Sequence, residues 1–246
     1  MSLWTLVGAA HYVNLGGAAN ADCNATDFGS GTSGSIAGVA VGDVIVVFCV
    51  NGGAQTVSDV RVNTNPSADT FNAGGRISQS GGNLDSYYCV VPNGSAQTGT
   101  ITYGIDWSAS TTSRAVIAQV WRPNGTLTVD TNSAGYQSAA NTTVFASAAS
   151  WVTTQADELL VCGGVSLNGK TWSLETINNS TSGVTIVNAG NVLHSWSNTA
   201  VSPGTMVQAY NEATLSASDN VMGFGFAFGT ASSGGGGIIL MGQACL

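Results

Sequence analysis

The fold is decided by the stretch Asp43–Val50, which reads DVIVVFCV. After the aspartate every residue is apolar, and most are β-branched. The stretch Glu158–Val165, ELLVCGGV, repeats the arrangement of an acid followed by an apolar run. Short continuous apolar runs of this kind are typical of strands buried on both faces. We therefore expect these two segments to be central β-strands.

Outward from these runs, short segments rich in Val, Ile, Thr and aromatic residues alternate with turn-forming Gly, Asn, Ser and Pro. Further strands are predicted at 57–62, 84–91, 99–105, 114–121, 126–130, 142–146, 171–174, 184–188, 192–196, 206–210 and 221–228. In the last segment Met222, Phe224, Phe226 and Phe228 alternate with small residues and are expected to point into a core. The predicted fold is all-β, an antiparallel β-sandwich of jelly-roll-like type.

The sequence predicts three regions: an N-terminal extension over residues 1–40 with an anchoring role, a β-sandwich over 41–229, and a tail over 230–246. The sandwich has two pseudo-repeated halves in this interpretation, 41–122 and 123–229, since each half places an acid before a buried strand and ends on an apolar strand. The alternative is that shared turn chemistry produced the similarity by chance.

The tail begins with a Gly/Ser linker, TASSGGGG, and continues as the apolar segment IILMGQACL. Two interpretations stay open for this segment. It folds back as a last strand on its own domain, or it is an assembly arm that docks onto a neighbouring subunit by strand addition or groove insertion. The arm residues would be Ile238, Ile239, Leu240, Met241, Cys245 and Leu246.

Charged residues make up 7% of the 246 residues, against roughly 25% in an ordinary soluble domain. Thirteen acids and five bases give a net charge of −8, and the bases are scattered, which argues against a nucleic-acid partner. No apolar run approaches the roughly 20 residues of a membrane span, and no basic residue precedes the N-terminal apolar stretch, so neither a membrane segment nor a signal peptide is expected. This composition suits extracellular β-structure and virus-particle proteins.

The sequence contains five cysteines and no CxxC pair, which is unlike a disulfide framework or a zinc site. Cys49, Cys89 and Cys162 lie inside apolar runs and are expected to be buried free thiols. Cys245 is the cysteine best placed for an intermolecular bond.

The sequence offers no catalytic motif, so an enzyme is not expected and no cofactor is predicted. The two histidines are His11 and His194, and His194 is expected to be a partly buried, hydrogen-bonded ring. Neither a G-x-S-x-G elbow nor a phosphate-binding glycine loop is present. A glycan-cleaving enzyme with a pair of carboxylates stays as a minor alternative.

Two binding sites are considered from residue type and position. Trp107, Trp172 and Trp196 are flanked by small polar residues, and on exposed loops they would stack on sugar rings. A loop with hard oxygen ligands would suit Ca²⁺, the one metal ion considered. Its candidate ligands are Asp59, Asn63, Asn65 and Asp69.

From about Val41 to Gly229 the chain resembles a β-sandwich domain that recurs in tailed-phage virion structural proteins and in bacterial surface proteins. The segments that carry the resemblance are GDVIVVFCV, YYCVVPNG, TGTITYGI, AVIAQVWRP, LTVDTNSAG and VTTQADELLVCGG. The resemblance implies a virion component and brings no catalytic residues with it. Residues 1–40 and the GGGG-IILMGQACL tail depart from the pattern.

Together these observations predict a non-enzymatic structural subunit of a phage or phage-like particle, such as a head decoration, spike, collar or tail protein. Its expected partners are other copies of itself and other virion proteins, and its expected location is the virion. The alternative is a carbohydrate- or receptor-binding module that contacts a host-surface glycan through exposed tryptophans during host attachment.

Overall fold

The computed structural model describes residues 3–23, 35–53, 55–62, 71–79, 81–93, 98–129, 134–146, 151–152, 158–177, 184–199, 208–209 and 211–231. Every regular element in these ranges is a β-strand. The strands are β1 (Trp4–Cys23), β2 (Ser35–Val39), β3 (Val44–Asn51), β4 (Val57–Val62), β5 (Asn72–Gln79), β6 (Gly82–Val90), β7 (Gly99–Pro123), β8 (Thr126–Val129), β9 (Ala134–Ala146), β10 (Trp151–Val152), β11 (Leu159–Ser166), β12 (Trp172–Ile177), β13 (Val184–Ala189), β14 (Leu193–Asn198), β15 (Gln208–Ala209) and β16 (Asn211–Ala231).

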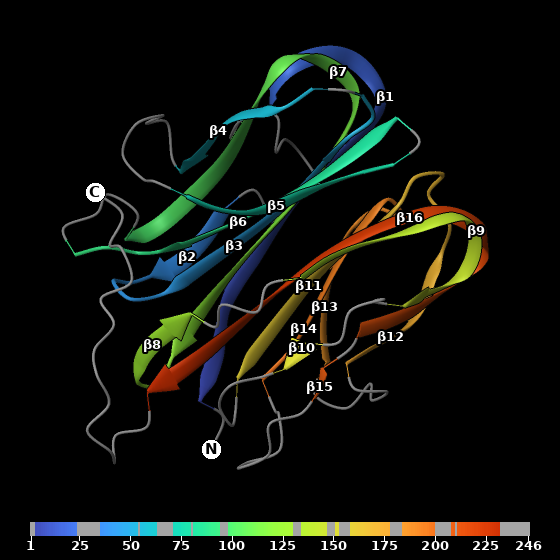
Figure 1. The fold of residues 1–246 in the computed structure, drawn as a ribbon. Coiled ribbons are helices and arrows are strands. Elements are labelled where there is room, and N and C mark those ends of the chain that lie inside the picture. The colour runs from blue at the N-terminus through green and yellow to red at the C-terminus, as the bar shows by residue number, and fades with distance from the viewer. Residues whose placement is uncertain are drawn as a thin grey trace.

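The strands form two seven-stranded antiparallel sheets that pack face to face as a sandwich, so the predicted fold class is confirmed (Figure 1). The first sheet has the order β1-β7-β3-β6-β5, with β2 and β4 also paired to β7. The second has the order β12-β16-β11-β14-β13, with β8 and β9 also paired to β16. A separate two-stranded sheet joins β10 to β15. The chain passes from the first sheet to the second between Pro123 and Thr126.

The two seven-stranded sheets have corresponding strand orders. The long strand β7 corresponds to β16, and β3, β6 and β5 lead from it to one edge as β11, β14 and β13 do. β4 beside β7 corresponds to β12 beside β16, and β1 corresponds to β8 and β9 taken together. The acids noted in the sequence precede corresponding strands, since Asp43 comes before β3 and Glu158 before β11, and both are buried.

The main core lies between the two sheets. β3 and β11 are buried along their whole length, as predicted for central strands. Met222, Phe224, Phe226 and Phe228 all enter this core. The predicted inward direction of these side chains is therefore confirmed.

Glycines let the rings of one sheet approach the backbone of the other. A Cβ atom added to Gly163 would lie 2.4 Å from the Phe48 ring, and one added to Gly74 would lie 2.3 Å from the Phe226 ring. These distances are far below van der Waals contact. Glycine at Gly163 and Gly74 is therefore part of the packing between the sheets.

A second core covers the other face of the first sheet. It contains Ile45, Val47 and Cys49 from β3 together with Ile101, Tyr103, Ile105 and Trp107 from the first part of β7. One strand can serve both layers because β7 is 25 residues long and bends, with β1 following it as a paired ribbon (Figure 1). The sequence predicted two strands here, 99–105 and 114–121, where the structure has one.

Some sequence-based boundaries need correction. Residues 1–40 are not separate from the sandwich, because β1 pairs with β7 along most of its length and Trp4 is buried in the main core. The predicted linker also starts too early, since Thr230 and Ala231 belong to β16 and pair with Leu127 and Thr126 of β8.

The cysteines of the apolar runs behave as predicted. Cys49, Cys89 and Cys162 are buried thiols that form no disulfide bond, and burial raises the pKa of the Cys162 thiol well above its ordinary value. Within the described ranges no helix is long and apolar enough to cross a membrane.

Candidate functional site

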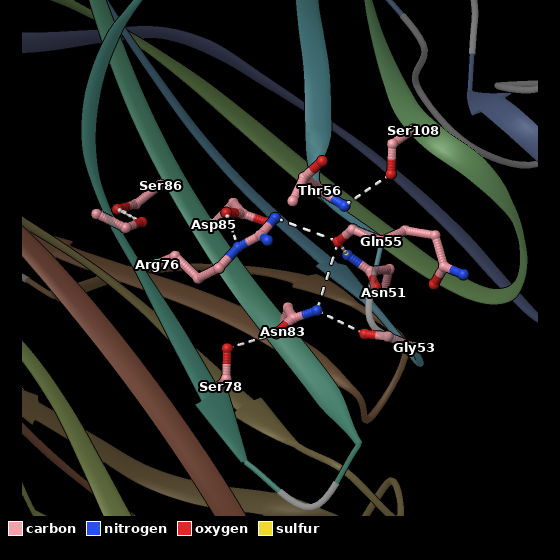
Figure 2. Close-up of polar contacts among 11 residues, drawn as sticks. Asn51, Gly53, Gln55, Thr56, Arg76, Ser78, Asn83, Asp85, Ser86 and Ser108 are labelled. Atoms are coloured by element: carbon pink, nitrogen blue, oxygen red, sulfur yellow. Dashed lines mark hydrogen bonds and ion pairs between the residues drawn. The ribbon is translucent and has the colours of Figure 1, made fainter.

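A polar cluster ties the loop after β3 to the β5–β6 hairpin (Figure 2). Its centre is the backbone carbonyl of Gln55, which accepts hydrogen bonds from Asn51 Nδ2 at 3.2 Å, Arg76 Nη2 at 3.2 Å and Asn83 Nδ2 at 3.4 Å. Asn83 Nδ2 also donates to the carbonyl of Gly53, and Ser78 Oγ donates to Asn83 Oδ1. Side-chain amides that bond backbone carbonyls in this way fix a loop that has no strand partner of its own.

Arg76 and Asp85 are the charged members of this cluster. Arg76 Nε donates to Asp85 Oδ1 at 2.7 Å and Nη2 to Oδ2 at 2.8 Å, so the pair is bidentate. The hydrogen bond with Asp85 raises the pKa of Arg76 above its ordinary value, despite partial burial. Since both oxygens of the Asp85 carboxylate are held by one guanidinium, the pair fixes the two strands of the hairpin relative to each other.

A second bidentate pair joins the two ends of the first half. Arg122, near the end of β7, donates from Nε and Nη2 to Asp43, each at 2.8 Å, and Nη2 also donates to the carbonyl of Gly38. Asp43 in turn accepts a hydrogen bond from the backbone N–H of Ala40. The hydrogen bond with Asp43 raises the pKa of Arg122. This contact fixes the turn between β2 and β3.

The second half brings together a carboxylate, a histidine and a tryptophan. His194 Nδ1 lies 2.8 Å from Glu175 Oε1, and the His194 ring stacks on Trp172 with centroids 4.8 Å apart. Trp172 Nε1 donates to the carbonyl of Asn191. Burial would raise the pKa of the Glu175 carboxyl, but its bonds to His194 and to the backbone outweigh burial and lower that pKa.

A bulge makes this cluster possible. Residues three apart in a regular strand point to opposite faces, yet Trp172 and Glu175 of β12 are both buried. The pairing of β12 with β16 shifts between Ser173 and Thr176, and Leu174 has a φ of 54°. The extra residue of the bulge turns both side chains toward His194 and leaves Leu174 exposed.

Asp219 of β16 lies beside the loop that joins β11 to β12 in the second sheet. Its carboxylate accepts hydrogen bonds from Ser166 Oγ, from both the backbone and the side chain of Asn168, and from the backbone of Asn220. Although Asp219 is buried and burial raises the pKa of a carboxyl, these donors lower its pKa below the ordinary value. The group therefore acts as a cap for the loop between β11 and β12.

The predicted tryptophan site needs correction. Trp107 and Trp172 are 3% and 7% exposed, because Trp107 packs in the second core and Trp172 against His194. Neither ring is the exposed platform that the sequence suggested. Trp196 lies in β14 two residues after His194, opposite Cys162 and Ile186, and its side chain falls outside the described set. Trp172 therefore lies beside β14, the strand that contains Trp196, whereas Trp107 lies in β7 of the first half of the chain.

Most of the calcium candidates and the whole assembly arm lie outside the described residues. Of the four proposed calcium ligands only Asp59 is described; it pairs with Asp106 in β7, and β1 places Asp22 on the other side of Asp106. Within the described ranges no group of three or more His, Cys, Asp or Glu side chains could hold a metal ion. Asn63, Asn65 and Asp69 are outside them, as are Ile238, Ile239, Leu240, Met241, Cys245 and Leu246.

Sequence reasoning did not foresee either the Arg76–Asp85 pair or the Glu175–His194 pair. For the first, a signal was present, because the dipeptide Gly81-Gly82 predicts a turn, and Gly81 lies between β5 and β6 in the hairpin that sets Arg76 opposite Asp85. For the second there was none, since a bulge in β12 cannot be read from the segment TWSLETI. His194 itself is buried and hydrogen-bonded, as predicted.

Comparison with protein-family models, curated proteins and solved structures finds no match for this chain. The function proposed below therefore depends on the composition, the resemblance described above and the geometry of the described residues.

Proposed function

We propose that the chain is a non-enzymatic structural subunit of a phage or phage-like particle, which assembles through the faces and edges of its β-sandwich. The resemblance of residues 41–229 to virion β-sandwich domains is the origin of this proposal. The observation that supports it best is where the few charged groups lie.

Three of the five basic residues make contacts with other groups of the same chain. Arg76 and Arg122 are paired with Asp85 and Asp43, and Arg114 is buried beside the Tyr12 ring and hydroxyl. Arg122 stays exposed, but Arg114 is buried, and so are the acids Asp43, Asp85, Glu158, Glu175 and Asp219. The surface of the described part therefore carries few charged side chains. Such a surface can be covered by a neighbouring subunit without the cost of desolvating charges, and it offers little to a phosphate backbone.

The test is the solution mass of the full chain beside a chain that ends at Ala231, measured by sedimentation velocity under reducing and oxidising conditions. Ending at Ala231 keeps the pairing of β16 with β8 intact. We expect the full chain to form a defined oligomer and the shorter chain to be smaller. Monomers for both, at concentrations up to the high micromolar range, would contradict self-assembly.

A glycan-binding module is the second candidate. Trp172 is buried against His194 and Trp107 is buried in the second core, so such a site would have to use Trp196 of β14. Screening against a glycan array, with Trp196→Ala and Trp107→Ala compared, tests it: binding lost only in Trp196→Ala supports the candidate, and no binding by the parent chain removes it.

A further inference from the structure

Among the described strands, β13 has a partner on one side only. β13 pairs with β14 over all of its residues, from Val184 opposite Asn198 to Ala189 opposite Leu193. On its other side no described strand is paired with it. An unpaired edge presents a row of backbone N–H and C=O groups to any other extended chain.

The corresponding edge of the first sheet, β5, is protected in ways that β13 is not. The pairing of β5 with β6 contains a bulge between Ala73 and Gly75, and β5 carries the charged Arg76. Bulges and charges are the usual means by which proteins prevent edge-to-edge pairing. β13 pairs with β14 without a register shift, and its sequence VTIVNA has neither charge nor proline.

The side chains of β13 also favour strand pairing. Val184, Thr185, Ile186 and Val187 are β-branched, the type preferred in strands. Ile186 is 46% exposed and is one of three large apolar side chains that stand out from the surface of the described part. An exposed isoleucine on a regular, uncharged edge is the pattern of a pairing site rather than of a solvated surface.

The chain itself contains a segment with matching chemistry. Residues 238–246, IILMGQACL, carry no charged side chain and begin with two β-branched residues. They follow the linker residues 232–237, SSGGGG, which come directly after the end of β16 at Ala231. Apolar segments of this type add readily to exposed strand edges.

We infer that the outer edge of β13 receives residues 238–246 of a second copy of the chain as an added strand. This inference rests on the proposed function, because it names the contact through which copies would assemble.

Strand direction favours a second copy. Ala227 of β16 is level with Leu160, Leu160 with Asn198, and Asn198 with Val184, so β13 begins at the end of the sheet where β16 finishes. A segment that returned from Ala231 along its own sheet would run parallel to β13. A segment from another molecule is free to run antiparallel, which is the slightly more stable arrangement.

Reach favours a second copy as well. The path from β16 across β11 and β14 to a strand beyond β13 spans four strand spacings, about 19 Å. Six linker residues reach about 20 Å only when fully extended, and a flexible Gly/Ser linker averages about 13 Å. A neighbouring molecule whose β13 edge lies nearer needs no such extension.

The first test compares self-association of the full chain with that of Ile186→Lys and Val41→Lys. Val41 is a matched control because it is 50% exposed, apolar and in the first half. A lysine on β13 would face apolar side chains of the added strand, so we expect Ile186→Lys to weaken self-association on the order of tenfold or more. Val41→Lys should associate as the parent does.

The second test asks which segment occupies the edge and does not depend on how the lysine variant folds. Cysteines are introduced singly at Val184, Ile186 and Asn188, which share one face of β13, and the full chain is treated with oxidised glutathione. We expect at least one variant to form a disulfide between copies with the native Cys245. Adding Cys245→Ser to that variant should abolish the cross-link.

The outcomes separate this inference from the proposed function. An oligomer that is unaffected by Ile186→Lys and gives no cross-link to Cys245 would overturn the inference and leave the assembly proposal standing. Cross-links between two introduced cysteines, rather than to Cys245, would show β13 paired with β13 and would exclude the arm as occupant. A cross-link to Cys245 within one monomer would place the arm on its own sheet, against the inference. A parent chain that never associates overturns both.

Discussion

Phe48 and Gly163 occupy corresponding positions in the two sheets and meet across the core. Each is the fifth residue of its strand, in β3 and β11, and each lies opposite a serine, Ser86 or Ser195, in the next strand. The Phe48 ring lies where a Cβ atom of Gly163 would be. Two phenylalanines here would clash and two glycines would leave a void. The two halves therefore differ at this pair of corresponding positions, which come into contact.

Replacing Gly163 by alanine tests this contact. The added Cβ would lie 2.4 Å from the Phe48 ring, so the ring or the sheets must move. We expect a loss of about 1–3 kcal/mol in the free energy of unfolding, the usual cost of overpacking a core. Chemical denaturation, followed by tryptophan fluorescence, measures it.

The matched control is a double-mutant cycle with Phe48→Leu. The smaller side chain leaves room for the alanine, so Gly163→Ala should cost less in this background, with a coupling free energy of about 1 kcal/mol or more. Equal costs in the two backgrounds would mean that the alanine acts through the backbone and not through the ring.

How well the sequence predicts the fold depends on where each strand gains its stability. β3, β11 and the second part of β16 are apolar runs buried by their own side chains, and they were predicted within a few residues. No strand was predicted for β5, NAGGRISQ, because its glycines make room for phenylalanine rings of the other sheet and do not follow a strand-like pattern. A glycine that is needed because it has no side chain gives no local sequence signal for a strand.

The contacts between polar side chains could also be predicted only in part from the sequence. An acid before a buried strand was visible in the sequence at Asp43 and Glu158, and both are buried there. The partner of Asp43 is Arg122, 79 residues further along the chain, and pairing between β3 and β7 brings them together. The Glu175–His194 pair needed both strand pairing and a bulge. Such contacts follow from the topology, which local patterns do not specify.

Replacing Asp85 by alanine tests the polar cluster. Arg76 would keep its place beside the loop carbonyl of Gln55 with its main partner removed. Loss of one member of a buried pair costs about 3–5 kcal/mol, and we expect the lower end because Arg76 is partly exposed. Hydrogen exchange of residues 51–57 should also rise.

As control, the double variant Asp85→Leu with Arg76→Met removes both charges and should recover most of the lost stability. Equal instability of the single and double variants would contradict the pairing of Arg76 with Asp85.

Acid stability tests Asp219. Its pKa in the folded protein is lowered by the Ser166 and Asn168 donors, so the unfolded chain takes up a proton first as the pH falls. The stabilisation is therefore complete at neutral pH and is lost as the pH falls below about 4 and through the folded pKa. Asp219→Asn should lower the free energy of unfolding by about 1–3 kcal/mol at pH 7 and by progressively less at pH 4 and pH 3, measured by urea denaturation.

The control is Asp106→Asn, at the half-buried Asp106 of β7, which should show a smaller change in the free energy of unfolding. A cost for Asp219→Asn that is the same at pH 7 and pH 3 would mean that the charge of the carboxylate does not hold the loop.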